Sequence, residues 1–143
     1  MVLKSKDKKG RIREEGTHLD RYIKSFKHAV DGIIYVIKNE HNVIIILLAI
    51  LLTTLSGILF RISTFEWISI ILCFGSVLSC EMINTAIEAV VDLETNKINP
   101  LAKLAKDTAS SATLIFSFTS LIIGIIIFIP KIGSALWNQA LLV

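Results

Sequence analysis

The chain has 143 residues, 53% of them hydrophobic and 19% charged, and a net charge of +3. That length suits a single domain, and so large an apolar fraction argues against an ordinary soluble domain and for a membrane protein. The two cysteines, Cys73 and Cys80, lie seven positions apart, which fits neither a metal site nor a disulfide framework.

The amino-terminal 18 residues are polar and rich in lysine, and we expect a mobile cytoplasmic tail there. The next segment, about 19–39, has apolar residues at helical spacing with cations between them. Such a helix is expected to lie in the membrane interface, with its charged side chains toward headgroups and water. Its apolar positions are Leu19, Tyr22, Ile23, Phe26, Val30, Ile33, Ile34 and Ile37.

Three further segments are expected to cross the membrane as helices, at about 41–60, 65–92 and 100–129. Each contains an uncharged stretch, at 43–60, 67–80 and 108–130, and the first of these is 18 residues long, enough to span a bilayer. The last helix has a clear start, because Asn99 suits the cap and Pro100 the first helical position. The predicted fold class is an all-α membrane protein with one domain at 19–130, followed by an extracytoplasmic tail at 131–143.

The positions of lysine and arginine predict how these helices are oriented. Ten of the fifteen lie in residues 1–40 and three between the second and third spans, whereas Arg61 and Lys131 are each alone in their segments. The positive-inside rule then places the amino terminus and the 92–107 loop in the cytoplasm. The net positive charge is explained by the membrane topology and by attraction to anionic lipid. No nucleic-acid partner is expected, because no nucleic-acid-binding fold or aromatic pattern occurs.

Polar residues interrupt the second apolar segment along a single helical stripe. Glu81, Glu88 and Asp92 fall within about 40° of one another on a helix, and Asn84 lies about 60° to one side. An acid at mid-membrane costs about 2.5–3.5 kcal/mol even on the milder scales, and a functional site is the default interpretation. Pairing with lysines for structure alone is the disfavoured alternative, because Glu81 has no cation within two turns on its own helix.

Neighbouring polar residues supply what phosphoryl transfer to a membrane-embedded hydroxyl requires. Glu40 and Glu88 are suited to hold Mg²⁺, which favours carboxylate oxygens, and Lys106 is suited to neutralise phosphate. Glu81, deepest in the apolar zone, is the candidate general base. No Gly-rich nucleotide loop of either common type occurs, so any nucleotide site must be built from side chains on helices.

The stretch EMINTAIEAVVD, residues 81–92, resembles the signature of the small prokaryotic integral-membrane lipid kinases, the diacylglycerol kinase and undecaprenol kinase family. The similarity extends to SFKHAVDG at 25–32, NEHN at 39–42 and PLAKLAKDTASSA at 100–112. The resemblance implies an interfacial helix and three transmembrane helices, assembled as a homotrimer with active sites at subunit contacts. It also implies ATP as phosphoryl donor with Mg²⁺, and a multi-pass location in the cell membrane.

The resemblance assigns roles to individual residues. Glu81 matches the catalytic base and Asn84 lies in the catalytic signature, while Glu40 and Glu88 match the metal-binding glutamates. The TASSA stretch departs from the usual Gly-containing version, a change interpreted as packing only. Nucleotide contacts are implied for Arg21, His28, Glu40, Glu88, Asp92, Lys106 and Asp107, with His28 standing where the family usually has tyrosine.

The identity of the lipid acceptor stays open at this point. The opening of the SFKHAVDG stretch and the PLAKLAKD stretch look more like the Gram-positive branch, in which undecaprenol is the favoured acceptor, and diacylglycerol is the alternative. A different class of function, a small proton- or cation-conducting helical oligomer, would use the same intramembrane acids as a relay. A kinase consumes ATP only with lipid and Mg²⁺, whereas a conductor needs no nucleotide.

Overall fold

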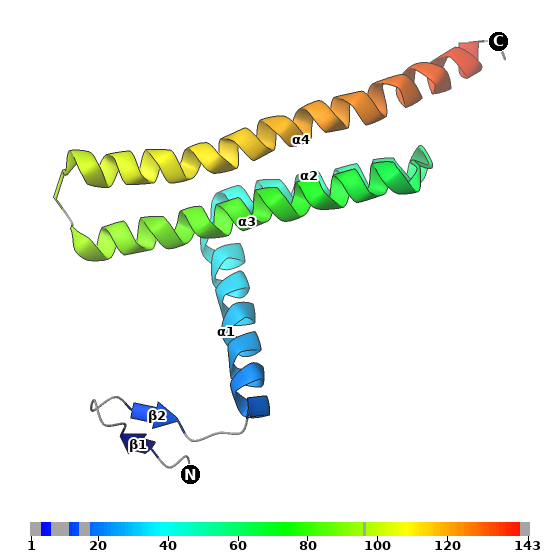
Figure 1. The fold of residues 1–143 in the computed structure, drawn as a ribbon. Coiled ribbons are helices and arrows are strands. Elements are labelled where there is room, and N and C mark those ends of the chain that lie inside the picture. Colours follow the sequence, from blue (N-terminus) through cyan, green and yellow to red (C-terminus); the bar gives the residue numbers. More distant parts are fainter. Residues whose placement is uncertain (1–3, 7–11, 15–17, 96, 141–143) are drawn as a thin grey trace. The chain divides into compact units, whose positions relative to one another are not determined.

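The computed structural model describes residues 4–6, 12–14, 18–95 and 97–140. Four helices account for most of them, which confirms the expected helical fold (Figure 1). In chain order the elements are β1 (Lys4–Lys6), β2 (Ile12–Glu14), α1 (His18–Asn39), α2 (His41–Leu59), α3 (Thr64–Glu94) and α4 (Pro100–Ala140).

The two short strands were not expected from the sequence. β1 and β2 pair antiparallel, with Lys4 opposite Glu14 and Lys6 opposite Ile12. These segments are polar and three residues long, so they lack the alternation of apolar and polar residues that predicts a strand. Mobility of the amino-terminal tail stays a prediction.

Residues 1–38 and 39–143 form two compact units. In the first, most of the apolar side chains of α1 are exposed, including Tyr22 and Phe26 at 74% and 73%. Because a soluble helix would bury such a face, this exposure agrees with the expected interfacial position.

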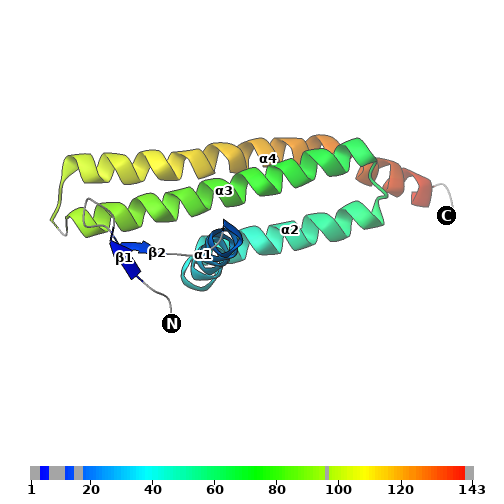
Figure 2. The same ribbon diagram turned by 60° about the horizontal axis from the view of Figure 1, so that its bottom comes forward.

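In the second unit, α3 packs along α4 in the opposite direction, and α2 packs against α3 (Figures 1 and 2). Its small core lies at the end of the bundle that carries the 60–63 loop, where Ile62, Ile70 and Ile127 are buried together. Phe60 and Phe128 meet edge to face at 6.2 Å between ring centroids, an arrangement that aromatic pairs favour.

The loop between α2 and α3 is fixed by several local contacts. Ser63 caps α3 in a capping box, because its hydroxyl accepts from Glu66 N and its own amide donates to Glu66 Oε2 at 2.6 Å. Lys131 Nζ of α4 lies 3.2 Å from Glu66 Oε2. Gly57 of α2 lies so close to Trp67 that a Cβ at this position would meet the indole ring at 2.8 Å. These contacts join α2, α3 and α4 at this end.

The other end of α4 confirms the expected helix start. Asn99 Oδ1 accepts a hydrogen bond from Leu101 N at 2.9 Å, and the helix begins at Pro100. At its far end, α4 continues through Pro130 to Ala140, whereas we expected it to end near residue 129. A proline removes one backbone donor but leaves the rest of the helical ladder intact, and membrane helices tolerate it.

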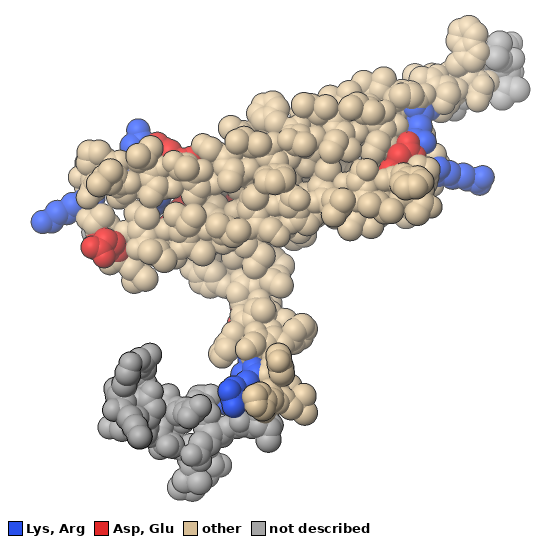
Figure 3. Space-filling model, in the orientation of Figure 1, with Lys and Arg blue, Asp and Glu red and all other residues tan. Residues whose placement is uncertain are grey.

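α2, α3 and α4 are each long and apolar enough to cross a membrane, and the protein is a multi-pass membrane protein. The three spans cover His41–Leu59, Thr64–Glu94 and Pro100–Asn138. In Figure 3 the charged side chains of this bundle gather toward its two ends, with a largely uncharged surface between them. That distribution matches an apolar band facing lipid and charged ends facing water.

Candidate active site

The polar stripe predicted on the second span lies on α3 and faces the interior of the bundle. Glu81 is 2% exposed and Asn84 is 7% exposed. Thr85, also buried, donates its hydroxyl hydrogen to the backbone carbonyl of Glu81 at 3.1 Å. Burying a carboxylate at this depth is costly without compensation, so these side chains mark the centre of the candidate site.

Asn84 connects the stripe to α4. Its amide nitrogen Nδ2 donates to Glu88 Oε1 at 3.0 Å, and its oxygen Oδ1 accepts from Ser110 Oγ at 3.2 Å. Each end of the amide therefore has a partner, which fixes its orientation. Ser110 of the TASSA stretch therefore takes part in this network through its hydroxyl, and the effect of the departure from the Gly-containing version on packing stays a prediction.

These groups line a cavity of about 330 Å³ between the three helices of the bundle. Two of the polar atoms in it, Glu81 Oε1 and Thr113 Oγ1, are buried without a hydrogen-bond partner among the residues that the structure describes. Buried polar atoms are rarely left in that state, and where they are, a functional role is one explanation. The lining consists of Asn42, Ile45, Ile46, Glu81, Asn84, Glu88, Ser110, Thr113, Leu114 and Ser117.

Sequence reasoning singled out three of these lining residues and missed the polar ones on the other helices. The structure brings Glu81, Asn84 and Glu88 into one cavity as expected from their shared stripe. It adds Asn42 from α2 and the hydroxyl residues of α4, Ser110, Thr113 and Ser117. Their spacing of three and four residues on an apolar helix was the signal that could have revealed a second polar stripe.

Asp92 and Lys106 form an ion pair at the end of the bundle that carries the 95–99 loop, with Lys106 Nζ 2.6 Å from Asp92 Oδ1. Both side chains are partly exposed, so the pair adds little to stability. The Lys106 ammonium and the Asp92 carboxylate therefore lie at this end of the interface between α3 and α4. Asp107 follows on α4 with its side chain exposed.

The remaining predicted site residues do not line this cavity. Glu40 is half-buried at the residue before α2, and its side chain makes no capping hydrogen bond. Arg21 and His28 are exposed on α1. No three acidic, histidine or cysteine side chains converge in a metal-binding group within the described ranges. The carboxylate of Glu88 has the oxygen chemistry that Mg²⁺ favours, with further ligands to come from phosphate and from other side chains.

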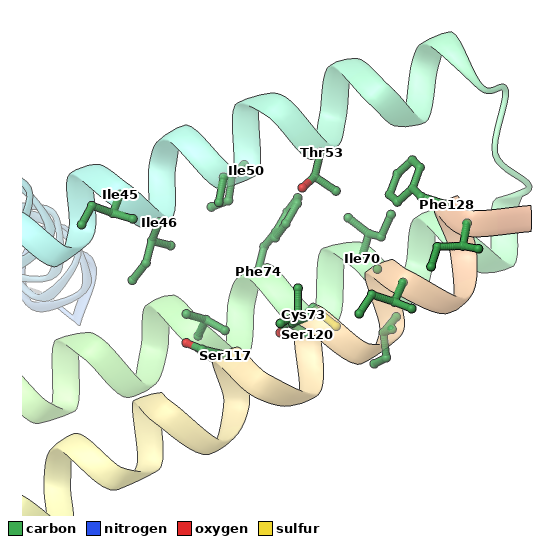
Figure 4. A pocket seen from close by; sticks show the side chains of 17 residues that line it. Ile45, Ile46, Ile50, Thr53, Ile70, Cys73, Phe74, Ser117, Ser120 and Phe128 are labelled. Atoms are coloured by element: carbon green, nitrogen blue, oxygen red, sulfur yellow. The ribbon is translucent and has the colours of Figure 1, made fainter. Parts of the chain in front are cut away.

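A larger, apolar cavity of about 550 Å³ continues from the polar one toward the 60–63 loop (Figure 4). The two cavities share Ile45, Ile46 and Ser117 in their linings. Figure 4 shows the Phe74 side chain of α3 extending toward Thr53 of α2, and it also labels Ile50 of α2, Cys73 of α3, and Ser120 and Phe128 of α4 in the lining. A polar group and a long hydrocarbon chain can thus be accommodated side by side.

Comparison with known proteins agrees with this arrangement of a polar site beside an apolar cavity in a membrane bundle. Residues 27–128 match the family model of prokaryotic diacylglycerol kinase. The chain is 42% identical to the undecaprenol kinase of Bacillus subtilis over 120 residues, which is 84% of this chain and 98% of that protein. It is 46% identical to a diacylglycerol kinase of Helicobacter pylori (strain J99) over 72 residues, 50% of this chain and 55% of that protein. A diacylglycerol kinase of Synechocystis is 28% identical over 77% of this chain and 63% of its own length. The chain therefore belongs to the prokaryotic diacylglycerol kinase family and is a membrane lipid kinase.

Proposed function

We propose that this kinase transfers the γ-phosphate of ATP to the hydroxyl of undecaprenol and forms undecaprenyl phosphate. The observation that carries the proposal is the continuity between the polar cavity of Glu81 and the apolar cavity beyond it, through Ile45, Ile46 and Ser117. A polyprenol consists of one hydroxyl and a long hydrocarbon, and its hydroxyl with the adjoining part of the hydrocarbon suits this pair of cavities. The similarity to an undecaprenol kinase over nearly all of that protein's length also supports it.

Each step of the transfer has a candidate side chain. The oxygen of the lipid hydroxyl attacks the γ-phosphorus, and Glu81 takes the proton of that hydroxyl. The bond between the γ-phosphorus and the bridging oxygen of ADP breaks. Asn84 holds Glu88 in place through its hydrogen bond. Glu88 and Glu40 hold Mg²⁺, which when bound neutralises charge on the phosphates.

The nucleotide is held nearer the cytoplasmic surface than the lipid hydroxyl. Lys106 contacts phosphate oxygens, and its ion pair with Asp92 keeps its ammonium group at the bundle end. Asp107 contributes a further polar contact, and the family resemblance assigns nucleotide contacts to Arg21 and His28 as well. Asp92 lies about 16 Å from Glu81 along α3, which leaves room for a triphosphate between them.

The test is phosphate transfer from labelled ATP to undecaprenol and to diacylglycerol, side by side in mixed micelles with Mg²⁺. We expect a higher kcat/KM for undecaprenol. A higher kcat/KM for diacylglycerol would identify diacylglycerol as the acceptor instead. ATP left unused with both lipids, together with proton or cation leakage from vesicles that contain the protein, would support the conducting alternative instead.

We propose that the amino terminus and the loop between α3 and α4 face the cytoplasm, because most of the cations lie there. Single cysteines at Lys24 and Lys97, in a background where Cys73 and Cys80 are replaced by alanine, should react with a membrane-impermeant reagent only in inside-out vesicles. Labelling of the cysteine at position 97 in intact cells would contradict this orientation, because the carboxylates of α3 would then face away from cytosolic ATP.

We propose that the kinase is a homotrimer in which Glu40 of one protomer meets Glu88 of another. Glu40 is not among the described residues that line the cavity with Glu88, which supports a contribution from a neighbouring subunit. Protomers with Glu40→Gln and with Glu88→Gln should each have strongly reduced activity alone and should regain part of the activity when mixed. Absence of recovery, with mixing proven by differently tagged subunits, would place each site within one chain.

A further inference from the structure

Thr113 differs from four other hydroxyl residues in the middle of α4. The hydroxyls of Ser111, Thr119 and Ser120 each donate to the backbone carbonyl four residues earlier, at distances of 2.7–2.9 Å. The Ser110 hydroxyl shares its single hydrogen between Lys106 O at 3.0 Å and Asn84 Oδ1 at 3.2 Å. This is the ordinary way for a hydroxyl to be satisfied within a helix. Thr113 Oγ1 makes no such bond and is buried without a partner among the described residues. Its hydroxyl is therefore available to a group in the cavity that it lines.

Thr113 lies at the same depth in the bundle as Glu81. The hydrogen bond between Ser110 and Asn84 fixes the register of the antiparallel helices α3 and α4. Thr113 is three residues beyond Ser110, and Glu81 is three residues before Asn84. Each is therefore about 4.5 Å from that bond along its helix, and in the same direction. The two buried and unpartnered oxygens, Thr113 Oγ1 and Glu81 Oε1, belong to residues on opposite helices of one cavity.

We propose that Thr113 binds the hydroxyl of the lipid acceptor together with Glu81, and so positions the oxygen that attacks the γ-phosphate. This inference rests on the proposed function and extends it to a residue to which the sequence assigned no role. The two orphan groups are complementary to an alcohol. A carboxylate accepts the hydrogen of the alcohol, and a threonine hydroxyl donates one to its oxygen.

The arrangement leaves one lone pair of the lipid oxygen for the reaction. As this lone pair forms the new bond to the γ-phosphorus, the proton of the lipid hydroxyl passes to Glu81. The bond from the phosphorus to the bridging oxygen breaks, and ADP leaves with its electron pair. Thr113 keeps its own proton throughout and holds the lipid oxygen in line.

The test compares Thr113→Val, which keeps the shape and removes the hydroxyl, with Thr113→Ser, which keeps the hydroxyl. Thr119→Val is the matched control on the same helix, since its hydroxyl is exposed and donates to Ile115 O at 2.9 Å. We measure kcat/KM for the lipid, KM for ATP and thermal stability on the full-length protein in mixed micelles. A hydrocarbon of the same length without the hydroxyl serves as a competitive inhibitor.

We expect Thr113→Val to lower kcat/KM for the lipid by about 5- to 100-fold, the effect of leaving one buried hydrogen bond unmade. KM for ATP, inhibition by the hydrocarbon and thermal stability should match wild type, and Thr113→Ser should retain most of the activity. A value within twofold of wild type in Thr113→Val overturns the inference, as does an equal loss in Thr119→Val. Wild type inactive on both lipids would instead overturn the proposed function.

Discussion

Replacing Glu81 by glutamine separates a catalytic role from a structural one, because the two predict opposite results. The substitution keeps size and removes the proton acceptor. A positioned carboxylate contributes about 10²–10⁴-fold to proton transfer, which corresponds to about 2.7–5.4 kcal/mol of transition-state stabilisation. Glu88 cannot take over the role, because it lies about 10 Å away along α3. We therefore expect kcat to fall by at least about 100-fold.

The thermal stability of Glu81→Gln should be equal to or higher than that of the wild type. Glu81 is 2% exposed, and its Oε1 has no hydrogen-bond partner among the described residues. Replacing a buried charge that lacks full compensation with a neutral group is often neutral or stabilising. Thermal unfolding in detergent should thus show an equal or higher midpoint for Glu81→Gln, with ATP affinity retained.

Glu66→Gln is the matched control, since it makes the same change about 22 Å away on the same helix. Glutamine still supports a capping box, and only the ion pair with Lys131 is lost, which adds little to stability because both side chains are partly exposed to solvent. Activity should therefore stay at the wild-type value. Near-normal turnover in Glu81→Gln, or equal losses in both variants, would refute the assignment of Glu81 as the base.

Two further predictions concern the metal and the helical packing. Glu88→Gln should raise the Mg²⁺ concentration needed for half-maximal activity, because it removes a carboxylate charge beside the phosphates; an unchanged Mg²⁺ dependence would exclude it as a ligand. Gly57→Ala should lower the free energy of unfolding by about 1–3 kcal/mol through overpacking against Trp67. Gly75→Ala, where the added Cβ would meet no atom within 4 Å beyond the local backbone of its own helix, should be neutral or stabilising by up to about 1 kcal/mol. Chemical or thermal unfolding of both variants tests this, and an equal response would contradict the packing argument.

The helices could be predicted because their signals are local. Long uncharged runs identify the spans, and Asn99 with Pro100 marks the start of α4, as the observed cap confirms. The end of α4 was not predicted correctly, because the helix was expected to end near residue 129 and it continues through Pro130 to Ala140. Ile132 and Leu136 continue the helical spacing of apolar residues beyond the proline, and this pattern outweighs the loss of one backbone hydrogen bond.

Only the part of the candidate site that lies on α3 could be predicted from the sequence. The stripe of Glu81, Asn84 and Glu88 follows from the helical period alone. Which residues of α4 face that stripe depends on the rotation and register of one helix against the other, and side-chain packing sets both. For that reason Ser110 and Thr113 emerged only from the structure.

The position of α2 has a consequence for how the reaction rate should be described. Within the described residues, α2 packs against α3 but not against α4, although both α2 and α4 line the apolar cavity. Within one protomer, the cavity therefore has a side that no contact between α2 and α4 closes, and that side lies at the depth of lipid hydrocarbon. A substrate arriving there diffuses in two dimensions and never crosses water. The mole fraction of lipid alcohol in the bilayer or micelle then controls the saturation of the enzyme. Adding inert lipid at a constant amount of lipid alcohol should lower the rate, as diluting the substrate does for a soluble enzyme.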